Sequence, residues 1–237
     1  METTSYNGHM VKPLELSTTA RRAFDRMGDD FSRVLGARFE GLVAYSPERG
    51  AAFASTVSAA DLDALSMLTD VWHRSGLSTP LLLTSDEFRR SLDAFPLEYQ
   101  AILDHHVVIA GTPPFAGAVV PREELRRACE TQAKGHLVHL RQAWLDSAGH
   151  SDHLAHRIAA SALPLRVLLS HVASLTGRDS TDAGQFATEA FPAFADLMRN
   201  VIALEHNEAG AKAMVPRLPQ YLAASEAIWE FVDKWGA

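Results

Sequence analysis

Histidine is the first residue type in this chain that could do chemistry, because eleven histidines occur in 237 residues. His150, His153 and His156 recur at every third position, and His136 and His139 show the same spacing earlier in the chain. Imidazole nitrogens are frequent zinc ligands. Along one straight helix, however, the third of three such residues turns away from the first, so they cannot all converge on one ion. We therefore expect solvated histidines near the start of a helix, and no metal site.

A second candidate is a series of cations at Arg127, Lys134 and Arg141, which recur every seven residues and could present a stripe to an anionic ligand. Glu123 and Glu130 interleave with these cations. Opposite charges three or four residues apart on a helix pair with each other. The pattern therefore favours a solvent-exposed helix face with internal ion pairs.

A third candidate is Arg199-Asn200 followed by His206, which resembles the arginine-polar-histidine motif of HEPN ribonucleases. That resemblance implies a helical bundle in which the arginine and the histidine meet at a dimer interface and cleave RNA. A chain rich in arginine and histidine contains such spacings by chance, and Arg166 with His171 is another example. The motif is kept as an alternative.

The elements that would position these residues begin with a helix over residues 17–36, indicated by an apolar stripe at helical spacing. Two apolar segments, 41–45 and 52–57, flank a turn that contains Pro47 and Gly50, which predicts an antiparallel hairpin. A helix over 61–76 follows, with Ser58 or Asp61 as its cap. Residues 79–111 then predict a strand, a helix and a strand, with a new helical turn at Pro96.

Residues 112–118 are rich in proline and glycine and have no periodic pattern, so we place a domain boundary after residue 118. Beyond it we find only helical patterns: four apolar stripes, two of them interrupted at Pro164 and near Pro192. Four helices joined by short loops favour an up-and-down bundle. The predicted fold class is α+β, with a small mixed-sheet domain over 12–118 and an all-α four-helix bundle over 119–237.

This order of elements, with the text PLLLTSDEFRRSLDAFPLEYQAILDHHVVIAG at residues 80–111, is similar to the nucleotidyltransferase superfamily of the polymerase-β type. The resemblance covers residues 17–237 and implies a nucleotidyltransferase-like first domain. Active members carry Gly-Ser at the end of the first strand, an Asp-x-Asp pair at the start of the next, and a third carboxylate. The carboxylates hold the Mg²⁺ ions that bridge the triphosphate, and the Gly-Ser backbone approaches the phosphates closely.

Here the first position reads Ala44-Tyr45-Ser46-Pro47, in which Tyr45 replaces the glycine and Pro47 lacks a backbone N–H. The second strand carries no acid. Asp61-Leu62-Asp63 spells the pair, but apolar residues at helical spacing follow it, so we interpret these acids as part of a helix start. The metal site is then missing, and the domain is expected to be a degenerate, non-catalytic member.

Composition sets further limits. Basic and acidic residues number 10 and 15 in residues 1–118, and 12 and 14 in residues 119–237, which argues against a nucleic-acid partner. The single cysteine, Cys129, excludes an internal disulfide and falls on an apolar stripe, so we expect a core residue rather than a nucleophile. We find no apolar run of membrane-spanning length and no signal peptide, so we expect a cytoplasmic protein without a membrane partner.

The sequence therefore predicts a binding module that needs no cofactor. Its ligand would be a nucleotide-like small molecule near Ser46 and Arg49, or a protein partner, including a second copy of the chain. Two alternatives remain open. One is an active Mg²⁺-dependent nucleotidyltransferase that uses Asp61 and Asp63, and the other is a HEPN-type ribonuclease or RNA-binding bundle that uses Arg199 and His206.

Overall fold

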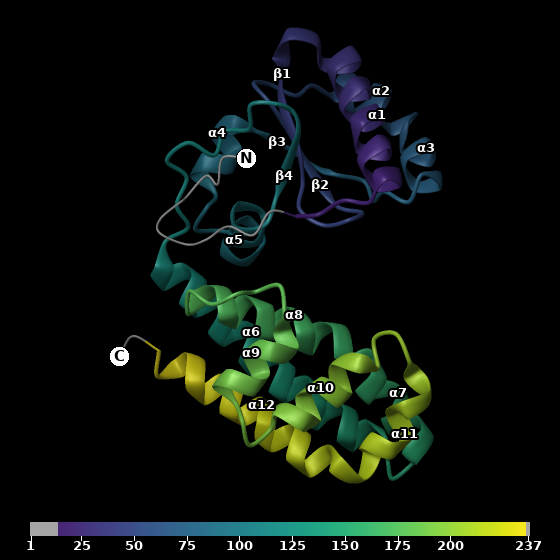
Figure 1. The fold of residues 1–237 in the computed structure, drawn as a ribbon, viewed down its shortest axis with the longest axis vertical. Coiled ribbons are helices and arrows are strands. Elements are labelled where there is room, and N and C mark those ends of the chain that lie inside the picture. Colours follow the sequence, from purple (N-terminus) through teal and green to yellow (C-terminus); the bar gives the residue numbers. More distant parts are fainter. Residues whose placement is uncertain (1–13, 236–237) are drawn as a thin grey trace. The chain divides into compact units, whose positions relative to one another are not determined.

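The computed structural model describes residues 14–235, which form two compact units that divide between Pro121 and Arg122 (Figure 1). Residues 12 and 13 of the predicted first domain lie outside the described residues. All strands of the described chain belong to the first unit, and its second unit contains helices only, so the expected α+β class is confirmed. The predicted boundary, after residue 118, falls in the irregular segment just before the division.

The sheet of the first unit has four strands in the order β3-β2-β1-β4. β1 (Phe39–Ala44) pairs antiparallel with both β2 (Gly50–Ala54) and β4 (Val107–Gly111), and β2 pairs in parallel with β3 (Leu81–Thr84). The predicted hairpin and the mixed sheet are thus confirmed. The parallel pair needs a crossover between its strands, and two short helices supply it.

Helices cover both faces of this sheet. They are α1 (Thr18–Leu35), α2 (Ala59–Ser66), α3 (Thr69–Arg74), α4 (Ser85–Arg90) and α5 (Pro96–Asp104), with a short 3₁₀ turn, η1 (Gly36–Arg38), after α1. Pro96 begins α5, as expected, because a first helical residue needs no N–H. The single helix predicted over 61–76 is divided into α2 and α3 around residues 67–68.

Strand alternation sends buried side chains to both faces. On one face, Phe24 and Phe31 of α1 pack in a buried cluster with Leu42 of β1. On the other, the rings of Phe53 and Phe88 lie 5.4 Å apart, edge to face. The sheet is therefore the central layer of its unit, with α1, α2 and α3 on one side and α4 and α5 on the other (Figure 1).

The second unit consists of helices and 3₁₀ turns. In chain order they are α6 (Arg122–Asp146), α7 (Ser151–Ala160), α8 (Ala162–Leu175), α9 (Ala183–Ala190), α10 (Ala195–Ala203), η2 (Glu208–Gly210), α11 (Ala211–Met214), η3 (Val215–Arg217) and α12 (Leu218–Asp233). Both predicted middle helices are divided. The first breaks at Ser161 and not at Pro164, which fits in the first turn of α8 because N–H groups there have no intrahelical partner.

Residues 151–175 form one helical stretch that is long and apolar enough to cross a membrane, and half of its most apolar window is buried within the protein. The core helix of a soluble protein has these same properties. The expectation of no such run is corrected here. The sequence alone does not show this stretch as a continuous apolar run, because Arg157 and Arg166 interrupt it and the helix breaks at Ser161.

Candidate functional site

The predicted ligand residues Ser46 and Arg49 form the turn between β1 and β2. The backbone N–H groups of Tyr45 and Ser46 donate to the Arg49 carbonyl oxygen at 3.0 and 3.3 Å. The Ser46 hydroxyl accepts from the N–H groups of Glu48 and Arg49 at 3.3 and 3.0 Å. The backbone donors that a phosphate would need at this position are therefore used within the turn. A ligand role for Ser46 and Arg49 stays a prediction.

Asp61 is buried at the start of α2, where it completes a capping box with Ser58. Its carboxylate accepts from the Ser58 N–H at 2.8 Å and from the Ser58 hydroxyl at 2.7 Å. Arg38 donates to both carboxylate oxygens, at 2.5 and 2.7 Å. Hydrogen bonds from Arg38 and Ser58 hold the pKa of Asp61 well below its ordinary value of 3.8. Asp61 therefore serves the structure of the helix start, while Asp63, on the same helix, is exposed.

No group of three or more histidine, cysteine, aspartate or glutamate side chains is placed to hold a metal ion within residues 14–235. His150 and His153 lie at the start of α7 with ring centroids 5.4 Å apart, and His156 lies further along that helix. All three are exposed. His136 and His139, on α6, face a different feature of the helical unit.

That feature is a cavity of about 470 Å³ between α6 and the α7–α8 pair, a size typical of small-molecule sites. Its lining combines apolar and polar groups. α6 contributes Gln132, Gly135, His136 and His139, and the junction between α7 and α8 contributes Ser161. We call this space the α6 cavity.

His136 lies at the α6 cavity and is only 8% exposed. Its Nε2 is 2.9 Å from the hydroxyl of Tyr221 on α12, and that hydroxyl is 3.0 Å from the Ser161 hydroxyl. Ser161 in turn donates to the Ile158 carbonyl oxygen at 2.7 Å. Three helical segments far apart in sequence are thus joined by one chain of hydrogen bonds.

With the hydrogen bond from Ser161 to Ile158 made, the proton count of this chain assigns one tautomer to His136. Ser161 has one hydroxyl proton, which it donates to Ile158, so Tyr221 must donate to Ser161. Nε2 of His136 must then carry a proton and donate to Tyr221. In a neutral imidazole the other nitrogen, Nδ1, is unprotonated and is a hydrogen-bond acceptor.

The neutral form of His136 follows from its surroundings. Burial, with a smaller contribution from His139, lowers the pKa of His136 to about 4. Among residues 14–235 no group is hydrogen-bonded to Nδ1, and no fully buried side-chain nitrogen or oxygen lacks a partner. Nδ1 must therefore reach accessible space, and His136 lines the α6 cavity. Nδ1 of His136 is therefore the candidate acceptor for a ligand in this cavity.

Gln132, one turn before His136, holds a second polar group at the same wall. Its side-chain oxygen is 2.8 Å from Nδ1 of His171 on α8. Burial lowers the pKa of His171 to about 4, so this ring is also neutral. Because an amide oxygen only accepts, the His171 nitrogen donates, and the amide NH₂ of Gln132 is not used in this contact.

Gly135 lies between these two residues in the middle of a long helix, where glycine is unfavourable by about 0.5–1 kcal/mol relative to alanine. Apart from its chain neighbours and the backbone of α6, a Cβ atom at this position would meet no atom within 4 Å, and the backbone is not in the left-handed region. Neither packing nor backbone conformation requires glycine here. Its missing side chain leaves the space at the cavity wall open.

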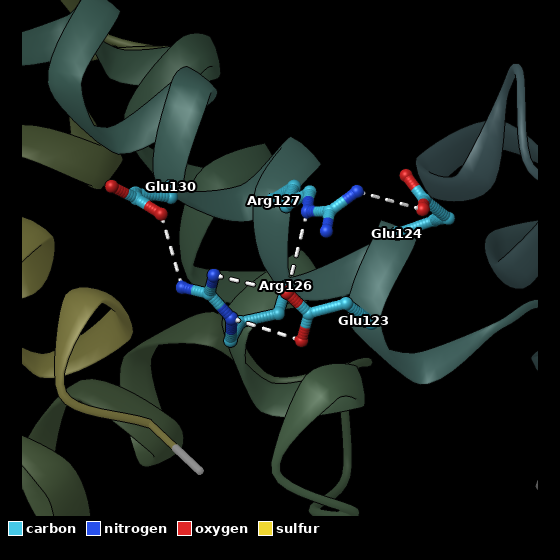
Figure 2. Close-up of polar contacts among 5 residues, drawn as sticks. All are labelled: Glu123, Glu124, Arg126, Arg127 and Glu130. Carbon is cyan, nitrogen blue, oxygen red and sulfur yellow. Dashed lines mark hydrogen bonds and ion pairs between the residues drawn. The ribbon is translucent and has the colours of Figure 1, made fainter. Parts of the chain in front are cut away.

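Each cation of the predicted stripe contacts another side chain of the helical unit. Arg127 pairs with Glu123 at 3.3 Å and with Glu124 at 3.0 Å. The neighbouring Arg126 pairs with Glu123 and Glu130, as Figure 2 shows. The other two cations contact α12. Lys134 lies 3.3 Å from the ring centroid of Trp229, and Arg141 pairs with Glu226 at 3.6 Å.

The residues of the HEPN-like motif are exposed, with Arg199 on α10 and His206 in the segment after it. Arg199 donates to the Thr188 hydroxyl at 2.8 Å. In the second match, Arg166 donates to both carboxylate oxygens of Glu205, at 2.6 and 3.1 Å, so it has a structural partner. A nuclease role for Arg199 and His206 stays a prediction.

Cys129 lies in the core of the helical unit with no exposed surface. Burial raises the pKa of its thiol to about 12, so the reactive thiolate is disfavoured. This agrees with the expectation of a core residue.

The α6 cavity cannot be predicted from the sequence, although one signal points to it. His136 falls on the buried stripe of α6 formed by Cys129, Ala133, Leu137 and Leu140. A polar residue on an apolar stripe needs a buried partner. Its partner, Tyr221, is 85 residues away, and no local pattern indicates that pairing.

Comparison of the chain with protein-family models, with curated proteins and with solved structures finds no match.

Proposed function

We propose that this chain is a nucleotidyltransferase-like protein that does not transfer nucleotides and instead binds a small molecule in the α6 cavity of its helical unit. The α/β unit would keep the fold of the superfamily without its metal site. The observation that carries the proposal is a cavity of ligand size that His136 lines, with one nitrogen of its ring already hydrogen-bonded to Tyr221.

The non-catalytic part is supported by the two positions that the superfamily uses for chemistry. Metal-dependent nucleotidyl transfer needs carboxylates that are free to hold Mg²⁺. Asp61 is instead bound by Arg38 and Ser58. The backbone at Ser46 is likewise committed to its own turn.

The binding part is supported by the lining of the α6 cavity. Small-molecule sites are concave and combine apolar walls with a few fixed polar groups. Here the chain of hydrogen bonds through Tyr221 and Ser161 fixes His136, and His171 fixes Gln132. Gly135 keeps the wall between them open. A site whose polar groups are held before binding loses less entropy when a ligand enters.

The test uses a variant that closes the cavity without disturbing the fold. Gly135→Leu places a side chain in open space on α6. Thr131→Leu is the matched control, since Thr131 is exposed on the same helix one turn earlier and does not line the α6 cavity. Both variants and the parent chain are screened by saturation-transfer NMR against nucleobases, nucleosides, amino acids and cyclic amides.

We expect at least one compound to bind the parent chain and Thr131→Leu but not Gly135→Leu. Circular dichroism checks that both variants are folded. The proposal is wrong if no compound binds, or if every compound that binds does so equally to Gly135→Leu.

A further inference from the structure

We propose that the α6 cavity recognises a neutral cyclic-amide edge, in which a ligand carbonyl accepts from Gln132 and the adjacent ligand N–H donates to Nδ1 of His136. This inference rests on the proposed function and names the ligand class of the same cavity. The edge occurs in simple lactams and in nucleobases such as uracil.

The donor of the pair comes from Gln132. The oxygen of its amide takes the proton of His171 Nδ1 at 2.8 Å, which fixes the orientation of the amide group. The NH₂ group must then point away from His171. Gln132 lines the α6 cavity, so that group is the donor available to a ligand.

The acceptor of the pair comes from His136. Its Nε2–H is committed to Tyr221 at 2.9 Å, which leaves the lone pair of Nδ1 free at the cavity. Gln132 and His136 are four residues apart on α6, so their Cβ atoms are neighbours on one helix face, about 6 Å apart. A donor and an acceptor side by side match a ligand that carries an acceptor and a donor side by side.

The charges around the cavity favour a neutral ligand. His136 and His171 are neutral at physiological pH because burial lowers their pKa values. At the rim, Arg157 of α7 and Asp146 of α6 lie 3.8 Å apart and offset each other, and His139 contacts Gln142 at 3.0 Å. Tyr221 of α12 is held protonated because burial raises its pKa. The two opposite charges at the rim therefore offset each other, and the buried groups of the lining are neutral.

The probes are uracil and 2-piperidone, each compared with its N-methylated form, 1,3-dimethyluracil and 1-methyl-2-piperidone. Methylation removes the N–H and keeps the carbonyl. Leaving a buried acceptor unpaired weakens binding by about ten-fold or more. Affinities are measured by titration in ¹H–¹⁵N NMR spectra of the full chain, following the amide signals of α6 and the α7–α8 junction.

A matched pair of variants tests the donor. Gln132→Glu keeps an acceptor for His171 and replaces the NH₂ group by an oxygen, so we expect uracil and 2-piperidone to bind about ten-fold or more weakly. Gln220→Glu makes the same change at an exposed position of α12 that does not line the cavity, and should leave both affinities within about two-fold of the parent chain.

The outcomes separate this inference from the proposed function. Preference for the N–H form of either probe, lost in Gln132→Glu, supports it, and the tighter probe distinguishes a nucleobase from a simple lactam. Equal binding of the methylated forms to the parent chain overturns the inference but leaves the cavity as a ligand site. If no probe and no other small molecule moves the cavity signals, both proposals fall. The methylated probes need no variant, so the inference stays testable if Gln132→Glu does not fold.

Discussion

Arg38 donates to both carboxylate oxygens of Asp61, at 2.5 and 2.7 Å, and so ties the turn before β1 to the first turn of α2. The acid that comes nearest to the superfamily motif is thereby a structural group. A structural role for Asp61 leads to predictions that differ from those for a metal ligand.

Substitution of Asp61 should destabilise the α/β unit. Asp61→Asn removes the charge that Arg38 contacts and weakens the capping box with Ser58, so we expect a lower midpoint of thermal unfolding. Asp63→Asn, two residues away and exposed, is the control and should leave the midpoint unchanged. Circular dichroism measures both. Equal midpoints for the two variants would contradict a structural role for Asp61.

Nucleotidyl transfer should be absent. With ATP, Mg²⁺ and an aminoglycoside acceptor, we expect no transfer of the nucleotidyl group, because Asp61 is bound by Arg38 and Ser58 and no group of three or more potential metal ligands occurs among the described residues. Mass spectrometry of the acceptor gives the readout. Transfer that Asp61→Ala or Asp63→Ala abolishes would refute this part of the account and favour the active-enzyme alternative.

Acid should weaken the helical unit through its two buried histidines. Folding lowers the pKa values of His136 and His171 from 6.5 to about 4, so below pH 6.5 the unfolded chain binds protons that the folded chain does not. Each histidine then reduces the free energy of unfolding by about 1.4 kcal/mol per pH unit until the pH reaches about 4. Urea unfolding between pH 7 and pH 4.5 tests this. His171→Gln should remove about half of the slope, whereas His150→Gln, at an exposed site, should not change it.

Glycine substitutions should have opposite effects in the two units. Gly135→Ala adds a methyl group that clashes with no neighbouring group, and it removes a flexible residue from α6. It should therefore stabilise the protein by about 0.5–1 kcal/mol. Gly111→Ala should destabilise it, because φ is +67° and a Cβ atom would overlap the Glu40 carbonyl oxygen across the sheet. Urea unfolding of both variants gives the comparison. Destabilisation by Gly135→Ala would mean that the wall of the α6 cavity is not open.

The sequence predicts those parts of the fold that local residues decide. Pro47 and Gly50 mark the hairpin turn, Ser58 caps α2 and Pro96 begins α5, because each of these effects acts within a few residues. The helix breaks near Met67 and at Ser161 are not predicted, since neither position carries a proline or glycine and packing decides them.

The candidate site could not be predicted from such local effects. The role of His136 depends on Tyr221 and Ser161, which reach it from other helices. Periodicity marks His136 as buried but cannot say which nitrogen carries the proton. Likewise, the open space at Gly135 depends on what α7 and α8 leave unfilled.

The ring nitrogens of His136 give the most direct measurement of the central claim. Long-range ¹H–¹⁵N NMR of the free protein at neutral pH should show a neutral ring with its proton on Nε2 and a bare Nδ1. When uracil or 2-piperidone is added, the Nδ1 signal should move as it accepts a hydrogen bond, and Gly135→Leu should prevent that change. A ring protonated at Nδ1, or a Nδ1 signal that stays fixed while a ligand binds, would contradict the account.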